Sequence, residues 1–179
     1  MAVVDAARLE RLLADDYAGD VTTVPMEELR AKRSECQAVE VALSYQRRMA
    51  QGRLDIVGAE QRRRADGAPP PSDDDLVRTL AATLADRTRP AGNGRLPQLM
   101  APDTDEVDTA ELDTIARPGA LARLVEVPDD ELTRLVEGLS GYEQAVSAKR
   151  RALHERIDAL QAEITRRYRT GEATIDGLL

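Results

Sequence analysis

Two copies of one polar pattern carry the residues of this chain that could bind a ligand. The copies lie 103 positions apart, and they consist of Glu40, Ser44, Arg47, Gln51 and Asp55, then Glu143, Ser147, Arg150, His154 and Asp158. Arginine can make paired hydrogen bonds to phosphate or to the O6 and N7 atoms of guanine, aspartate can accept from guanine N–H groups, and serine and glutamine can reach phosphate or sugar. This set of side chains suits a guanine nucleotide. Two related half-sites favour a ligand with twofold symmetry of its own.

A structural role for the same residues is the alternative. Glutamate and arginine at heptad positions commonly form salt bridges between helices and set their register. Such charges need only complement one another, whereas here the same pattern recurs in the same order. The repetition therefore favours ligand binding, and a coiled-coil adaptor without a nucleotide ligand is the competing hypothesis.

Catalysis is not predicted for these residues, and neither is a metal site. His154 stands where the first copy has Gln51, and both side chains can donate and accept a hydrogen bond, which indicates a binding role. No nucleophile or second base accompanies His154, and the sequence has no glycine-rich phosphate loop for nucleotide hydrolysis. One Cys and one His make a zinc site implausible. A nucleotide-processing enzyme is thus the most remote of three hypotheses.

Two long helices must position the polar residues. Apolar side chains recur at intervals of seven in two matching columns, which are Leu29, Cys36, Leu43, Ala50 and Val57, then Leu132, Leu139, Val146, Leu153 and Leu160. This heptad spacing predicts paired helices, which we expect at 25–66 and 128–170, each opened by a proline and ended by a glycine. On each helix the polar pattern lies within about 80° of arc, beside the apolar column. Helices paired through these columns would leave the polar residues along a shared rim or groove.

The remaining segments are expected to be short or irregular. We predict a short helix within 1–24, a flexible connector at 67–127 with short helices, including one that carries Leu76 to Leu84, and a tail at 171–179. The connector is rich in proline, glycine and aspartate, so part of it is expected to be disordered. An internal duplication of about 25–57 as 128–160 explains the repeated pattern. The fold class is therefore all-α, a two-helix coiled-coil hairpin, although a connector of this length permits either helix direction.

The composition excludes several classes of protein. The 179 residues include no Trp, no Phe and four Tyr, so a compact mixed core is not expected. The formal net charge of −8 argues against binding to the phosphate backbone of nucleic acid, which requires a basic face. Cys36 is expected in the core, whereas Tyr45, Tyr142 and the run from Arg62 to Arg64 are expected to be exposed. No secretory leader or membrane span is recognisable, and we expect a cytoplasmic protein.

The spacing Glu-x3-Ser-x2-Arg-x3-Gln-x3-Asp, together with the stretch from Arg33 to Asp55, resembles the cyclic di-GMP signature of the RsiG-type anti-sigma factors. The resemblance covers both long helices. It implies an antiparallel hairpin whose two motifs bind an intercalated pair of cyclic di-GMP molecules and hold the sporulation sigma factor WhiG in an inactive complex, without direct DNA binding. By this resemblance every pattern residue except His154 would be a ligand contact. His154 is the departure from the motif, where the contact of the usual glutamine is kept, altered or lost.

Overall fold

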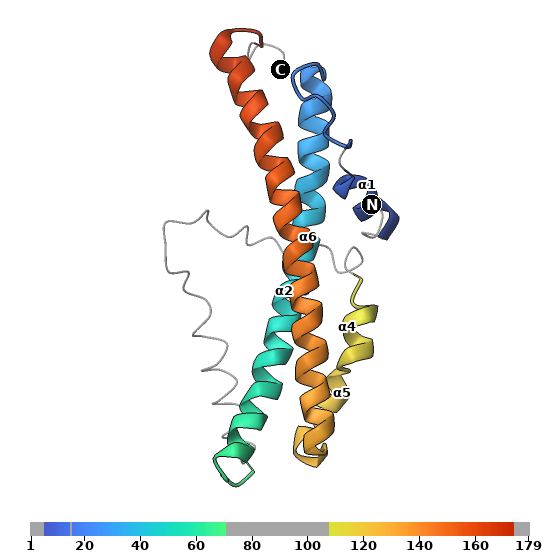
Figure 1. Cartoon of the computed structure of the whole chain (residues 1–179), viewed down its shortest axis with the longest axis vertical. Coiled ribbons are helices and arrows are strands. Elements are labelled where there is room, and N and C mark those ends of the chain that lie inside the picture. The colour runs from blue at the N-terminus through green and yellow to red at the C-terminus, as the bar shows by residue number, and fades with distance from the viewer. Residues whose placement is uncertain (1–5, 15, 71–107, 174–179) are drawn as a thin grey trace. The chain divides into compact units, whose positions relative to one another are not determined.

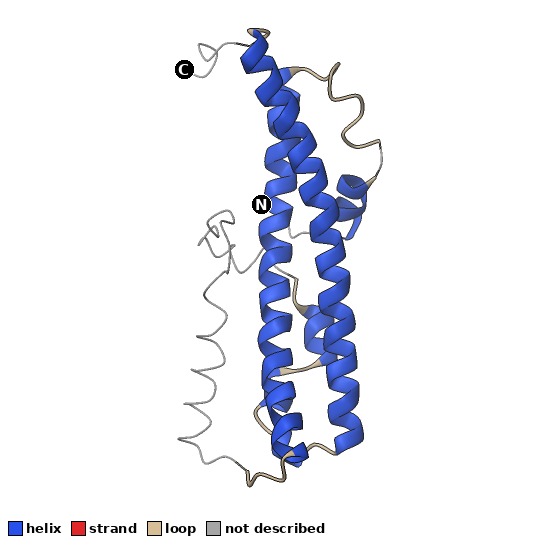
Figure 2. Ribbon diagram, turned by 60° about the vertical axis from the view of Figure 1, so that its left-hand side comes forward, coloured by secondary structure: helices blue, strands red, loops and turns tan. Residues whose placement is uncertain are grey.

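The computed structural model describes residues 6–14, 16–70 and 108–173, and every regular element within these ranges is a helix (Figure 1 and Figure 2). In chain order they are α1 (Ala6–Leu13), α2 (Met26–Ala65), α4 (Ala110–Ile115), α5 (Pro118–Leu121), the 3-10 helix η2 (Leu124–Glu126) and α6 (Asp129–Thr170). The all-α fold is confirmed. The long helices were predicted at 25–66 and 128–170, and the structure has them as α2 and α6. The helix predicted around Leu76 to Leu84 lies outside the described residues.

Local residues set the ends of α2 and α6. The carbonyl oxygens of Pro25 and Pro128 accept the first hydrogen bonds, from the amides four positions on, at 3.0 Å and 2.9 Å. Acidic side chains occupy the first turn of each helix and arginines the last, where they complement the helix macrodipole. Gly67 and Gly171 follow with φ of 63° and 76°, a left-handed conformation that glycine adopts without strain. Among the described residues, none of the helices combines the length and the apolar character needed to cross a membrane.

The helices form two compact units, and α2 and α6 contribute to both. The first unit contains α1, the part of α2 up to Tyr45 and the part of α6 from Val146 onward. The second unit contains the part of α2 from Gln46 onward, α4, α5, η2 and the part of α6 up to Ala145.

Within each unit the two long helices run antiparallel, as the family resemblance implied. Residues further along α2 contact residues earlier in α6, which only opposite helix directions allow. The contacting pairs are Arg30–Tyr168, Arg33–Gln161 and Glu40–Arg150 in the first unit, and Gln51–Glu143 and Arg64–Asp129 in the second.

The predicted apolar columns form the cores of the units. Every residue of both columns is buried, with at most 3% of its surface exposed. Cys36 is fully buried among them, as expected for a small core residue. Tyr142, which was expected to be exposed, is also buried. Its ring extends the buried surface of α6 beyond the apolar column, so that prediction was wrong.

Two equivalent arginines dock the short helices onto the long ones. Arg53 is 6% exposed and donates to two backbone carbonyl oxygens at the end of α4, at 3.0 Å and 2.6 Å. Arg156, which lies 103 positions later, donates to two carbonyl oxygens at the end of α1. Leu9 of α1 and Leu112 of α4 are likewise equivalent and buried. The segment from 108 onward, predicted as part of a flexible connector with short helices, thus supplies part of the second unit's core.

A second repeated contact holds the chain just before each long helix. Glu60 accepts hydrogen bonds from Arg63 and Arg64, and Arg64 also donates to the carbonyl oxygens of Leu124 and Val127 at 2.7 Å and 2.8 Å. The equivalent contacts in the first unit are those of Glu163, Arg166 and Arg167, the last of which donates to Val21 and Thr22. Arg64, with 20% of its side chain exposed, is therefore an anchor for this segment rather than the solvated helix end we expected. These contacts also extend the duplication to about 9–64 and 112–167.

Candidate functional site

The structure distributes the two copies of the polar pattern between the units. The first unit holds Glu40, Ser44, Ser147, Arg150, His154 and Asp158, and the second holds Arg47, Gln51, Asp55 and Glu143. Each unit therefore combines residues of one copy, from α2, with residues of the other, from α6. We call these two sets the first and second half-sites.

Glu40 is the centre of the first half-site. Its Oε1 atom accepts hydrogen bonds from Ser44 Oγ at 2.7 Å and from Arg150 Nη2 at 2.7 Å and Nε at 3.1 Å. His154 Nε2 lies 3.2 Å from the same oxygen. Burial disfavours the charged carboxylate, but the hydrogen bonds of Ser44 and Arg150 and the charge of Arg150 outweigh it, so the pKa of Glu40 lies below its ordinary value.

Glu143 has the same place in the second half-site. Its Oε1 atom accepts hydrogen bonds from Arg47 Nε at 3.0 Å and from Gln51 Nε2 at 3.0 Å. Arg47 keeps 36% of its side-chain surface exposed, so a ligand can reach the guanidinium. In both half-sites the glutamate of one motif thus holds the arginine of the other motif, on the facing helix.

His154 makes the contact that glutamine makes in the other copy. Gln51 reaches Glu143 and His154 reaches Glu40, each through a side-chain nitrogen and at 3.0 Å and 3.2 Å. An imidazole N–H can replace an amide N–H as a donor to a carboxylate. The departure from the motif therefore preserves this interaction within the protein.

Three residues of the pattern remain to be placed, which are Ser147, Asp55 and Asp158. Ser147 is half-buried and follows Glu143 by one turn of α6, as Ser44 follows Glu40 on α2. Asp55 is half-buried one turn beyond Gln51, and the equivalent Asp158 is exposed. The two carboxylates end the pattern in both half-sites.

Arg53 and Arg156 are the positioning residues that the sequence reasoning missed. Each lies in α2 or α6 next to the pattern, and each fixes a short helix against the long one beside a half-site. Both arginines match at the offset of the repeat, but their type alone did not indicate that they would donate to backbone carbonyl groups. The signal that could have found them is the repetition of Leu9 as Leu112 at the same offset.

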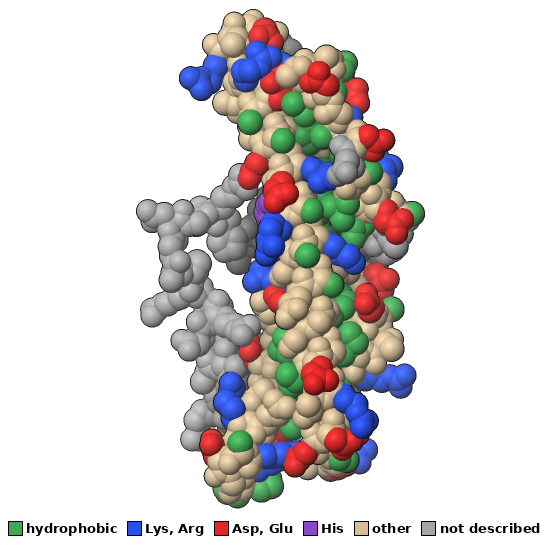
Figure 3. All heavy atoms as spheres, in the orientation of Figure 1, with side chains coloured by type: hydrophobic (Ala, Val, Ile, Leu, Met, Phe, Trp, Pro, Cys, Tyr) green, Lys and Arg blue, Asp and Glu red, His purple; other side chains and the backbone are tan. Residues whose placement is uncertain are grey.

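The charges around the half-sites are mixed. On the face shown in Figure 3, acidic and basic side chains are interspersed along the helices rather than gathered into one basic surface. Within the described ranges no three His, Cys, Asp or Glu side chains are grouped so that they could hold a metal ion. What the half-sites offer a ligand is hydrogen bonding and charge, through guanidinium, carboxylate, hydroxyl and amide groups.

A protein-family model matches most of the chain. The chain matches the family model described as RsiG-like over residues 15–84 and 118–179, and each matched segment contains one long helix and one copy of the polar pattern. No curated protein matches the chain.

Proposed function

This chain belongs to the RsiG-like family, and from that premise we propose that it is an anti-sigma factor that binds cyclic di-GMP and sequesters a WhiG-type sigma factor. Membership of the family supports the anti-sigma role and a sigma factor as partner. The proposal adds the nucleotide, the WhiG type of the partner, a role in sporulation and a cytoplasmic location. It assigns the chain no enzymatic activity, because blocking a sigma factor requires only binding.

The equivalence of the two half-sites is the observation that carries the proposal. Arg150 and Arg47 are each held by a glutamate from the facing helix, at 2.7 Å and 3.0 Å. An arginine that is already oriented loses less conformational freedom when it binds a planar acceptor. Two arginines in matching surroundings suit two equivalent guanine or phosphate groups, which cyclic di-GMP, a twofold-symmetric dinucleotide, contains.

Ligand and partner would then support each other's binding. If the nucleotide contacts both the half-sites and the sigma factor, thermodynamic linkage requires that each raise the affinity of the other by the same factor. The formal net charge of −8 also complements the basic, DNA-binding surfaces of a sigma factor.

A structural role is the second candidate, and the same contacts favour it. The pairs Arg47–Glu143 and Arg150–Glu40 are salt bridges between helices, as expected if these residues only set the register of the two helices. The structural role assigns no purpose to the hydrogen bonds of Ser44 and Gln51 or to the contact of His154 with Glu40. The two candidates differ in whether a nucleotide binds at all.

Calorimetric titration of cyclic di-GMP into the purified chain, alone and with its sigma factor, tests the proposal. Arg47→Ala and Asp158→Ala should abolish nucleotide-dependent association. Arg48→Ala is the matched control, because Arg48 is the exposed neighbour of Arg47 on α2 and should behave like the wild type. Equal nucleotide responses from the Arg47 and Arg48 variants would favour the structural candidate.

A further inference from the structure

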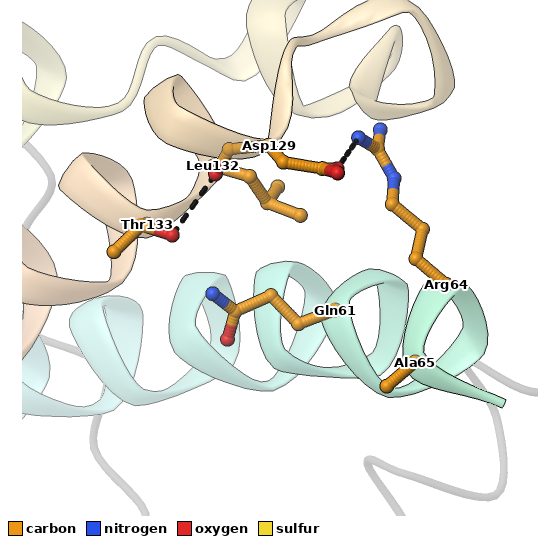
Figure 4. A pocket seen from close by; sticks show the side chains of 6 residues that line it. All are labelled: Gln61, Arg64, Ala65, Asp129, Leu132 and Thr133. Carbon is orange, nitrogen blue, oxygen red and sulfur yellow. Dashed lines mark hydrogen bonds and ion pairs between the residues drawn. The ribbon is translucent and has the colours of Figure 1, made fainter.

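A hollow lies in the second unit between the end of α2 and the start of α6 (Figure 4). Its volume is about 410 Å³, and it is lined by Gln61, Arg64, Ala65, Asp129, Leu132 and Thr133. Gln61 and Leu132 project toward one another from the two helices, and Arg64 reaches Asp129 at the rim (Figure 4). None of these residues belongs to the two half-sites.

The equivalent region of the first unit is filled by side chains of the chain itself. Leu29, Leu160 and Ile164 form a buried cluster there, and Met26 and Tyr168 pack against it. Arg30 donates a hydrogen bond to the Tyr168 hydroxyl, and its guanidinium lies 5.7 Å from the centre of the tyrosine ring. The tyrosine is therefore held by packing, by a hydrogen bond and by a cation–π contact.

The internal duplication shows why the second unit is hollow. At the offset of the repeat, Tyr168 corresponds to Ala65, and Arg30, which holds it, corresponds to Thr133. Leu132, the equivalent of Leu29, is only 1% exposed and keeps part of the floor apolar, whereas Gln61 stands at the position of Ile164. The hollow thus lies where the aromatic ring would stand if the second copy had a tyrosine in place of Ala65.

The rim differs from that of the first unit in its charge. Asp129 stands at the position of Met26 and pairs with Arg64, whereas Asp130 and Glu131 correspond to the equally acidic Glu27 and Glu28. Beside it, Val125 of η2 exposes 49% of its surface, the single large apolar side chain so exposed in the described part of the chain. Arg64, through its bonds to Asp129 and to the carbonyl oxygen of Leu124, joins the hollow to η2.

We propose that this hollow receives an aromatic side chain of the sigma factor. The inference rests on the proposed function for the identity of the partner. The first unit indicates that the occupant is an aromatic ring. At the equivalent positions there, Tyr168 packs against the buried cluster and is held by Arg30. Aromatic anchors buried in a pocket are the typical centres of binding energy at protein interfaces.

The test introduces into the second unit the two residues that fill this region in the first. In the double variant Ala65→Tyr with Thr133→Arg, the new side chains should fill the hollow as Tyr168 and Arg30 do in the first unit. Association with the sigma factor, measured at saturating cyclic di-GMP, should weaken at least about tenfold. Binding of the nucleotide to the free chain and the thermal midpoint should stay at wild-type values. Ala31→Tyr, at an exposed alanine of α2 outside the hollow, is the control and should bind the sigma factor normally.

Several outcomes would overturn the inference. A folded double variant that binds the sigma factor like the wild type would do so, and so would an equal loss of binding in the Ala31 control. If sedimentation showed a wild-type dimer that the double variant abolishes, the occupant would be a second copy of this chain instead. Should the double variant be unstable, Ala65→Tyr alone carries the same test, because Ala65 is exposed at the end of its helix. Failure of the wild-type chain to associate with any sigma factor would instead refute the proposed function, and with it this occupant.

Discussion

The Nε2 atom of His154 lies 3.2 Å from Oε1 of Glu40, so the residue that departs from the family pattern still contacts the glutamate of the facing helix. Gln51 makes the same contact with Glu143 in the second half-site. Histidine and glutamine thus make equivalent contacts with a carboxylate in the two half-sites.

Restoring glutamine at this position should have little effect. We predict that His154→Gln changes the dissociation constant for cyclic di-GMP by less than about threefold, because one N–H donor replaces another. His154→Ala should weaken binding about tenfold, since it removes a polar contact with the Glu40 carboxylate. Isothermal titration of the three proteins checks this, and an alanine variant with wild-type affinity would show that His154 has no role in the site.

Lysine should not substitute for Arg47 or Arg150 in nucleotide binding, although it carries the same charge. Arg47→Lys and Arg150→Lys keep the net charge but lose the planar fork that binds guanine or phosphate through two hydrogen bonds. Each is expected to weaken nucleotide binding by about tenfold or more. Arg48→Lys and Arg151→Lys, at exposed neighbouring positions, are the matched controls. Lysine variants that bind as tightly as wild type would indicate that the arginines act only as point charges.

Arg53 should contribute to stability more than other arginines of α2. It is nearly buried, donates to two carbonyl oxygens of α4 and pairs with Asp113. We predict that Arg53→Ala lowers the free energy of unfolding by about 2–4 kcal/mol, because it leaves buried acceptors without their charged donor. Arg48→Ala should change it by less than about 0.5 kcal/mol. Urea unfolding followed by circular dichroism measures both, and equal values would contradict the anchoring role of Arg53.

Acid should destabilise the folded chain through two equivalent glutamates. Hydrogen bonds from Arg63 and from Arg166 hold the pKa values of Glu60 and Glu163 at about 2, below the ordinary value of 4.5. A carboxyl group with a lowered pKa stabilises the folded state fully above its unfolded-state pKa, and this stabilisation is lost as the pH falls through the folded-state value. Stability should thus decline between about pH 4.5 and pH 2.

The variants Glu60→Gln and Glu163→Gln should reduce that decline. Both amides still accept a hydrogen bond from arginine but do not titrate, so the urea midpoint of each variant should vary less over this range than that of the wild type. Glu155→Gln, at an exposed position of α6, is the control and should follow the wild type. A Glu163 variant with an unchanged pH dependence would disprove the assignment.

Much of the fold could be predicted from local sequence. The seven-residue recurrence from Leu29 to Val57 specified a long helix and its buried face, because the helical period places those side chains on one side wherever the helix lies. Pro25 and Gly67 indicated where α2 begins and ends for equally local reasons. The helix direction was available only from the family resemblance, since a long connector permits either direction.

Contacts between distant segments were not predictable in the same way. Nothing in the types of Arg53 or Arg156 distinguishes a buried anchor for a short helix from an exposed arginine, because the acceptors are backbone carbonyl groups that any sequence supplies. The same limit applies to the hollow beside Ala65, which exists only because two helices meet there and one copy lacks the ring that fills the other.

The sequence by itself determined the repeated polar pattern, the helices that carry it and the family to which the chain belongs. The tertiary structure alone decided that each glutamate meets the arginine of the opposite copy, with Glu40 on Arg150 and Glu143 on Arg47. Helical periodicity depends on neighbours along the chain, whereas these pairings depend on which face of one helix packs on which face of another.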